Sequence, residues 1–88
     1  MKNSIWKFNF PIKDRITIQM PKGAEILTVQ NQNEEGTLWA ICNTEADKEP
    51  RYFLIYGTGH PIDTDGKKYI GTFQVSGGRL VWHLFEIV

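Results

Sequence analysis

The sequence predicts a mostly β protein, a small antiparallel β-sandwich or barrel of about seven strands. Polar and apolar residues alternate with a period of two along much of the chain, which is typical of half-buried strands, and no segment of helical length shows a 3.6-residue period. Glycine, proline and asparagine interrupt the alternation at short intervals, as they do between the strands of small all-β domains. The 88 residues suffice for one domain, which we expect to span residues 1–88.

The first two predicted strands alternate most clearly. The segment Ile5–Phe10 places its three aromatic rings on one face of a strand, and Pro11 ends it because proline cannot donate to a sheet ladder. The segment Arg15–Met20 places its two isoleucines and Met20 on one face in the same way. We therefore predict that each strand turns one apolar face toward the core.

The segments Glu25–Gln30 and Thr37–Cys42 are the third and fourth predicted strands. The residues between them are polar and end in Gly36, a composition typical of hairpin connections. These two strands are therefore expected to pair antiparallel. Residues 43–50 are mostly charged and polar, and we predict a surface loop there.

Three further strands are predicted in the C-terminal part. The segment Arg51–Tyr56 is almost continuously apolar and aromatic, which favours a strand covered on both faces. The segments Lys68–Val75 and Arg79–Ile87 flank the sequence Ser76-Gly77-Gly78. Because this sequence is typical of a tight turn, the last two strands are predicted to form a hairpin.

Composition limits the classes of partner. Ten basic and ten acidic residues give a net charge of zero, whereas proteins that bind long nucleic acids usually carry a basic excess. No apolar run reaches the roughly 20 residues of a membrane helix, and the N-terminus has no apolar segment of signal-peptide length. The single cysteine, Cys42, lies in an apolar run and is expected to be buried. We therefore expect a cytosolic protein that binds neither long nucleic acid nor membrane.

The segment Tyr56–Pro61 is the strongest candidate for a binding site. Gly57 and Gly59 surround Thr58 at the end of a strand, where glycines allow unusual backbone angles and the close approach of another molecule. Exposed amides in such a bend form a concavity for anions, and the side chains of Thr58 and His60 add hydrogen bonds. A tight turn that simply requires glycine is the alternative interpretation. The segment is neither a dinucleotide fingerprint nor a Walker motif, because the third glycine and the lysine that follows a Walker loop are missing.

Aromatic and basic residues extend this candidate site. Aromatic rings on a β surface stack on nucleobases, although core packing is their commoner use. Tyr56 and Tyr69 are preferred, because each lies beside a glycine-containing segment or turn. Lys22, beside a turn glycine, and Arg51, at the start of the most apolar strand, are the preferred cations for an anionic ligand. The predicted ligand-binding residues are Lys22, Arg51, Tyr56, Gly57, Thr58, Gly59, His60 and Tyr69.

The sequence offers little support for metal binding or catalysis. His60 and His83 have no acidic or cysteine partner at a spacing typical of metal sites, and the apolar alternation around His83 favours a core histidine. We therefore predict no metal and no cofactor. Thr58, His60 and Asp63 supply the residue types of a nucleophile, a base and an orienting group, but they crowd into one loop where a relay is hard to align. We predict that the protein is not an enzyme, with a small nucleotide hydrolase as an alternative.

Five segments together resemble a family of small proteins of unknown function that is common in bacteriophages and prophages. The order and spacing of these segments carry the resemblance, which covers almost the whole chain. They are Met20–Gln30, Leu38–Ala40, Tyr56–Ile62, Tyr69–Gln74 and Val81–Glu86. The resemblance implies a viral protein that is made in the cytoplasm of a host bacterium.

Small β-rich phage proteins include sponges that sequester the cyclic nucleotide signals of bacterial immunity, as anti-CBASS proteins do. By analogy, we expect this chain to bind a small anionic ligand, a cyclic oligonucleotide, without cleaving it. A phage protein-binding module or virion accessory protein is the first alternative. Because so small a domain is marginally stable alone and exposes sheet edges, we also expect a homo-oligomer, a dimer or tetramer.

Overall fold

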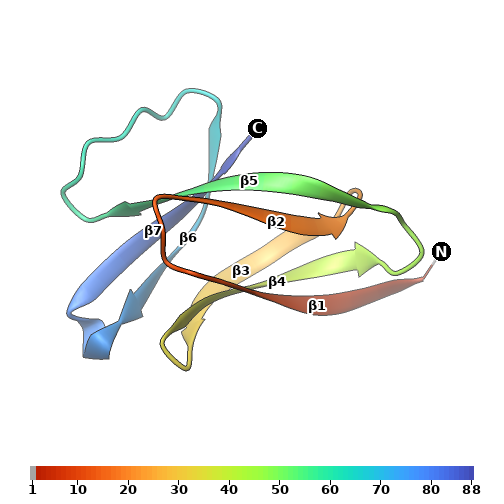
Figure 1. Cartoon of the computed structure of the whole chain (residues 1–88), viewed down its shortest axis with the longest axis horizontal. Helices are drawn as coiled ribbons and strands as arrows, with labels where there is room; N and C mark the ends of the chain where they lie inside the picture. Colours follow the sequence, from red (N-terminus) through yellow and green to blue (C-terminus); the bar gives the residue numbers. More distant parts are fainter. Residues whose placement is uncertain (1) are drawn as a thin grey trace.

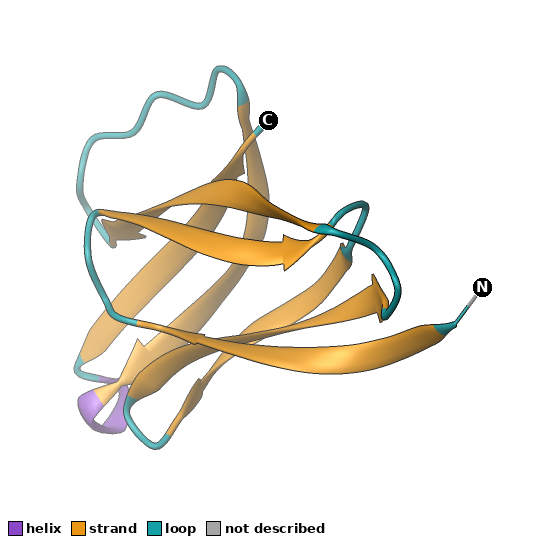
Figure 2. Ribbon diagram, turned by 45° about the vertical axis from the view of Figure 1, so that its right-hand side comes forward, coloured by secondary structure: helices purple, strands orange, loops and turns teal. Residues whose placement is uncertain are grey.

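Two antiparallel sheets pack face to face around an apolar core (Figure 1, Figure 2). The computed structural model describes residues 2–88, and it confirms the mostly β fold class. The three-stranded sheet has the order β1-β4-β3, and the four-stranded sheet has the order β2-β5-β7-β6. The strands are β1 (Asn3–Phe10), β2 (Arg15–Pro21), β3 (Glu25–Gln32), β4 (Glu35–Asn43), β5 (Lys48–Gly57), β6 (Lys67–Val75) and β7 (Leu80–Ile87).

Alternation along the strands sorts side chains into core and surface, as the sequence predicts. In β2, Ile16, Ile18 and Met20 are buried, whereas the residues between them are exposed. β1 contributes the buried Phe10, whose ring meets the ring of Phe73 edge-on at 6.0 Å between centroids. The other buried apolar residues are Ala24, Val29, Leu38, Ala40, Cys42, Phe53, Ile55, Val75 and Leu84.

Both predicted hairpins form. β3 and β4 pair antiparallel through the turn residues Asn33 and Glu34, whose φ angles are 56° and 64°. Two positive φ angles match such a turn to the twist of its strands. β6 and β7 pair around the short 3₁₀ turn Ser76–Gly78. The two hairpin tips meet where the amide of Ser76 donates a hydrogen bond of 2.8 Å to the Glu34 carboxylate (Figure 2).

A glycine lets the two sheets approach closely along one side. Gly71 lies in β6 beside a break in the register with β7. A Cβ atom on Gly71 would lie 2.7 Å from Cγ1 of Val29, which belongs to β3 in the other sheet. A side chain at this position would force the sheets apart. The glycine therefore brings β3 and β6 together and partly closes this edge of the sandwich.

Two predictions for the middle of the chain are wrong in part. The predicted surface loop at residues 43–50 is shorter, because Lys48–Pro50 extend β5 and pair with β2. β5 is not covered on both faces, since Phe53 and Ile55 are buried while Tyr52 on the opposite face is 42% exposed. The reason is the architecture, because the four-stranded sheet has a second layer on one side only.

Cys42 is fully buried in β4, as predicted. Its Sγ atom lies 3.6 Å from the carbonyl oxygen of Ala40, a weak donor contact. Burial raises the pKa of the Cys42 thiol, and the positive charge of Arg51 opposes part of this rise. The thiol is therefore a small apolar core group with low reactivity.

Candidate functional site

The predicted binding segment forms an exposed bend at the end of β5 (Figure 1). Gly59 adopts a φ angle of +90°, a conformation that favours glycine. The ring of His60 folds back against the strand end, because a Cβ atom on Gly57 would lie 2.9 Å from Cε1 of that ring. The two glycines thus have different tasks: one makes the bend, and the other makes room for the imidazole.

Two amides of the bend already have acceptors, which corrects the predicted anion-binding concavity. The Thr58 amide donates to the Val81 carbonyl at 3.3 Å, and the His60 amide donates to the Gly57 carbonyl at 3.1 Å. The bend closes on itself as a turn and is tied to β7. Its contribution to binding therefore has to come mainly from its side chains.

A row of polar groups continues from the bend across the outer face of the four-stranded sheet. At its centre, His83 in β7 has a threonine hydroxyl beside each ring nitrogen. Its Nε2 atom is 2.7 Å from Oγ1 of Thr58, and its Nδ1 atom is 2.9 Å from Oγ1 of Thr72. The Thr72 hydroxyl is 2.6 Å from the hydroxyl of Tyr69. These four residues, which we call the His83 network, fix the orientation of the imidazole.

Aromatic rings lie beside the His83 network on the same face of the sheet. Phe85 is central, with its ring centroid 5.7 Å from that of Tyr56 and 5.4 Å from that of Tyr69. The contact with Tyr56 is edge-to-face and the contact with Tyr69 is tilted, both favourable arrangements for aromatic pairs. Tyr69 remains 54% exposed. The structure thus brings the two predicted tyrosines together through a phenylalanine between them.

Two hollows of about 220 Å³ each adjoin the bend, and Gly57, Thr58 and His60 line both. The first, which we call the aromatic hollow, is also lined by Tyr56, Gly59, Ile62, His83 and Phe85. The second, which we call the arginine hollow, is also lined by Arg79, Leu80, Val81 and Trp82. A larger hollow of about 380 Å³ lies elsewhere, at Asn9, Phe10, Pro11 and Glu35, and includes none of the predicted site residues.

Lys22 does not join this site. It lies in the turn after β2, beside the start of β5, because Pro21 pairs with Lys48. The bend lies at the opposite end of β5, which at 10 residues is about 30 Å long. A ligand held at the bend is therefore out of reach of Lys22, and we remove this lysine from the candidate site.

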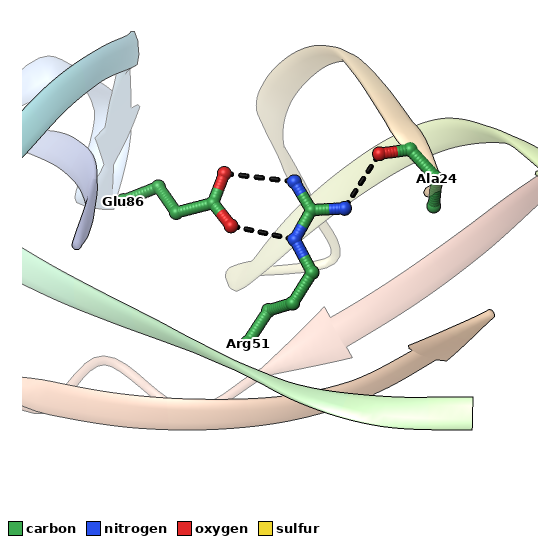
Figure 3. Close-up of polar contacts among 3 residues, drawn as sticks. All are labelled: Ala24, Arg51 and Glu86. Atoms are coloured by element: carbon green, nitrogen blue, oxygen red, sulfur yellow. Dashed lines mark hydrogen bonds and ion pairs between the residues drawn. The ribbon is translucent and has the colours of Figure 1, made fainter. Parts of the chain in front are cut away.

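Arg51 is also removed, because each of its three side-chain nitrogen atoms already donates a hydrogen bond inside the protein (Figure 3). Its Nε and Nη2 atoms donate to the two carboxylate oxygens of Glu86, and its Nη1 atom donates to the carbonyl of Ala24. The Arg51 and Glu86 side chains are only 18% and 9% exposed. The hydrogen bond to Glu86 raises the pKa of Arg51, and burial opposes this rise. Because Ala24 precedes β3, this guanidinium connects the two sheets rather than an external anion.

The residues of the site that were not among the predicted ligand-binding residues include Thr72, Arg79, His83 and Phe85. The apolar alternation of β7 conceals the last two, although His83 is half-buried on the outer face and not in the core. When residues are counted outward from the turn Ser76–Gly78, Thr72 pairs with His83. This contact could therefore have been predicted from the register of the hairpin. The position of Arg79 beside the bend depends on the pairing of β5 with β7. Neighbouring residues in the sequence do not predict this pairing.

The relay of Thr58, His60 and Asp63 that the hydrolase alternative would use does not form. The histidine bonded to Thr58 is His83, 25 residues away in the sequence, whereas His60 packs against Gly57. Asp63 accepts a hydrogen bond of 3.0 Å from the amide of Asp65. Within residues 2–88, no three His, Cys, Asp or Glu side chains gather as a metal site would require. The same part of the chain has no helix with the length and apolar character needed to cross a membrane.

One family model matches the chain over its full given length. No curated protein and no solved structure matches it. The model that does match covers residues 1–88 and describes a domain of unknown function, DUF7352. The chain therefore belongs to the DUF7352 family.

Proposed function

We propose that the protein binds a small nucleotide at the bend after β5 and holds it without cleaving it. The observation that carries this proposal is the aromatic hollow, where the rings of Tyr56 and Phe85 adjoin the His83 network beside an exposed glycine bend. Ligand sites combine apolar walls with a few fixed polar groups. The aromatic hollow has both, and hydrogen bonds on either side hold its central imidazole in place.

A nucleobase matches the chemistry of the aromatic hollow. Bases stack on aromatic side chains with about 1–3 kcal/mol per base. The Thr58 hydroxyl, which shares one hydrogen bond with His83, keeps acceptor capacity for the polar edge of a base, while the His83 ring, bonded at both nitrogens, supplies a flat wall.

The phosphate is assigned to the arginine hollow on account of Arg79. This guanidinium makes no ion pair with any residue of 2–88, so its charge is available, and arginine binds phosphate with paired hydrogen bonds. An anion here would therefore meet the free guanidinium of Arg79 in the wall of this hollow.

The size of the two hollows favours a ligand that spans both. Each is about 220 Å³, whereas drug-sized ligands occupy pockets of about 300–1,000 Å³. Because the hollows share three bend residues, one molecule can reach both. A nucleotide carries an aromatic base at one end and a phosphate at the other, and a cyclic oligonucleotide repeats this pairing.

The biological role that we propose is sequestration of a cyclic oligonucleotide. Tight binding without turnover lowers the free concentration of a signal by mass action. The resemblance to phage proteins supports a role inside an infected bacterium, where such a signal would otherwise activate immunity. The bend amides do not form an anion site, and Lys22 and Arg51 do not belong to the binding site. The proposed role therefore depends only on the residues at the end of β5.

Calorimetry with a panel of cyclic dinucleotides, cyclic trinucleotides and their linear counterparts tests the proposal. We expect heat of binding and a raised melting temperature with at least one cyclic class. Phe85→Ala should weaken that binding by about tenfold or more, given the worth of one stacked base. Tyr52→Ala is the matched control, because Tyr52 lies on the same face but lines neither hollow. No heat with any nucleotide, or equal losses in the two variants, would refute the proposal.

One observation favours hydrolysis as a second candidate function. Thr58 and His83 have the distance of a nucleophile and a base, and Thr72 occupies the place of the orienting group. An oxyanion, however, needs free donors nearby, and the amides of Thr58 and His60 already donate to carbonyl groups. The orienting group is also a hydroxyl without charge. We therefore rank hydrolysis second.

Mass spectrometry of the bound ligand separates these two candidates. After incubation and denaturation, the binding proposal predicts that the nucleotide is recovered intact. Hydrolysis predicts a product that accumulates with time and disappears in Thr58→Val, a variant of the same shape without the hydroxyl. Product formation that survives Thr58→Val would contradict a role of Thr58 as nucleophile.

A further inference from the structure

We propose that the loop between β5 and β6 is a lid that closes over a nucleotide bound in the aromatic hollow. We call this segment, residues 58–66, the crossover loop. The inference rests on the proposed function, because a lid over this hollow needs a ligand to cover. It gives a task to Ile62, which lies in the crossover loop and lines the aromatic hollow.

The sheet topology sends the crossover loop along the outer side of the four-stranded sheet (Figure 1). β5 and β6 are both antiparallel to β7, which lies between them, so they run parallel to each other. The loop leaves β5 at Gly57, beside Trp82 of β7. It enters β6 at Lys67, beside Ile87 at the other end of β7, and therefore has to return along that strand. The other sheet packs against the inner face, so the return path lies on the side of the aromatic hollow.

The crossover loop is longer than this path requires. The two strand ends are five residues apart along β7 and two strands apart across the sheet, which corresponds to roughly 20 Å. An extended chain from Gly57 to Lys67 can span roughly 33 Å. The excess length lets the middle of the loop move toward or away from the sheet without disturbing β5 or β6.

The middle of the crossover loop has few contacts that would hold it in one position. Every residue from Thr58 to Gly66 is exposed. Within the part of the chain that the structure describes, the amides of Ile62 and Asp63 donate no hydrogen bond. Segments with exposed backbone and few anchoring contacts open and close at low free-energy cost. The loop therefore has the properties that a lid needs.

Two glycines near the ends of the crossover loop are suited to act as hinges. Gly59 has a φ angle of +90° and Gly66 has a φ angle of +68°. A Cβ atom on Gly59 would meet no atom within 4 Å, so this position needs the conformational freedom of glycine and not its small size. The hinges of lids are a few loop positions that absorb changes in φ and ψ.

Ile62 is the residue that would cover a bound base. It lines the aromatic hollow together with His83 and Phe85, yet it is 40% exposed. An exposed isoleucine at the border of a hollow gains free energy when a ligand removes its apolar surface from water. A base in the hollow would thus favour closure of the loop, and the closed loop would slow the release of the base.

Limited digestion with the protease Asp-N, which cleaves before aspartate, tests closure directly. The probes are cyclic di-AMP, cyclic di-GMP and cyclic tri-AMP, each added to the full chain. We expect a probe that binds to slow cleavage before Asp63 and Asp65 by about tenfold or more, because proteolysis follows the population of the open form. Asp14 and Asp47 lie exposed in other loops and are internal controls, whose cleavage should not change.

Ile62→Ala tests the covering side chain. In stopped-flow measurements with the same probe, we expect the dissociation rate to rise by about fivefold, because the closed loop loses the apolar surface that covers the base. The association rate should change little. Leu27→Ala is the matched control, because Leu27 is 45% exposed on the other sheet and lines neither hollow.

Gly66→Ala tests the hinge without touching the ligand. Gly66 lines neither hollow, but alanine is strained at its φ angle of +68°. We therefore expect this variant to raise the dissociation rate as well. Gly23→Ala is the matched control, because it introduces the same strain, at a φ angle of +80°, in the turn after β2.

The outcomes separate the lid from the proposed function. Binding with unchanged cleavage before Asp63 and Asp65 would overturn the lid and leave the nucleotide site intact. Equal dissociation rates in Ile62→Ala and the parent protein, or slower cleavage at all four aspartates, would also overturn the lid. A lack of binding by every probe would refute the proposed function, and the lid with it.

Discussion

Two polar clusters of opposite kinds lie along β5. In the first half of the strand, the Arg51 guanidinium bonds to Glu86 and to the Ala24 carbonyl between the sheets (Figure 3). At its end, the hydroxyl of Thr58 and the ring of His83 share a hydrogen bond on the outer face, beside the aromatic hollow. The first, closed cluster is a buried ion pair, whereas the second, open cluster consists of hydroxyl groups and an imidazole beside an open hollow.

This contrast shows that charge alone does not mark a ligand site. A guanidinium whose N–H groups are used by a carboxylate and a carbonyl has little left for a ligand, and separating the pair leaves a buried charge unpaired. A hydroxyl or an imidazole at the edge of a hollow keeps its capacity to rearrange its hydrogen bonds. The closed cluster is expected to determine stability, and the open cluster is expected to determine binding.

Arg51→Leu should have the largest effect on stability. It leaves the Glu86 carboxylate buried without its partner, and breaking such pairs costs about 3–5 kcal/mol. We expect a loss of about 3 kcal/mol in the free energy of unfolding, at the low end because both side chains retain some exposure. Urea denaturation measures this loss. The double variant Arg51→Leu/Glu86→Leu should recover much of it, and a double variant as unstable as the single one would contradict a closed pair.

His83→Ala should affect stability little and nucleotide affinity strongly, the opposite of Arg51→Leu. We expect the free energy of unfolding to change by no more than about 1 kcal/mol, because water replaces the ring at two exposed hydroxyls. Nucleotide affinity should fall by about tenfold, as one wall of the aromatic hollow is lost. Calorimetry and urea denaturation on the same preparation give both numbers. A variant that unfolds as readily as Arg51→Leu while it still binds the nucleotide would reverse the roles of the two clusters.

Gly57→Ala should produce a smaller loss of affinity. A Cβ atom on this residue would lie 2.9 Å from the His60 ring, so the imidazole must move away from the border of both hollows. Affinity is expected to fall a few-fold in calorimetry. In a His60→Ala background the ring is absent, and the same substitution should then have almost no further effect. An equal loss in both backgrounds would show that the ring position does not matter.

The smallest effect concerns Cys42, which is buried near the closed cluster. Because burial raises the pKa of its thiol in the folded protein, the unfolded chain loses this proton first as the pH rises. The stabilising contribution is thus fully present below the unfolded pKa, about 8.5, and is lost as the pH rises through the folded pKa. Thermal melting should therefore show a smaller decrease above about pH 8 in Cys42→Ala than in the parent protein. Parallel pH profiles would contradict a buried, neutral thiol.

Local signals predict much of the fold. The alternation of Ile16, Ile18 and Met20 fixes the buried face of β2, and short turns fix both hairpins. The placement of β5 between β2 and β7 has no comparable signal, because it joins segments that are far apart in the sequence. The exposure of Tyr52 follows from that placement and not from the composition of the strand.

The candidate site could be predicted only in part for the same reason. The glycines around Thr58 predict an exposed bend, and the register of the last hairpin pairs Thr72 with His83. Nothing near Arg51 in the sequence reveals its carboxylate partner, which lies 35 residues away. A basic residue at a strand end therefore appears free in the sequence, although folding has already paired it.

Amide chemical-shift mapping during titration with the panel of cyclic nucleotides tests the central claim most directly. The claim is that a ligand is held at the end of β5 beside the His83 network. We predict that the shifts concentrate in residues 56–60 and 79–85 and that the amides of Lys22 and Arg51 stay unchanged. Shifts centred on Lys22 and Arg51, or no shifts with any nucleotide at millimolar concentration, would contradict the account.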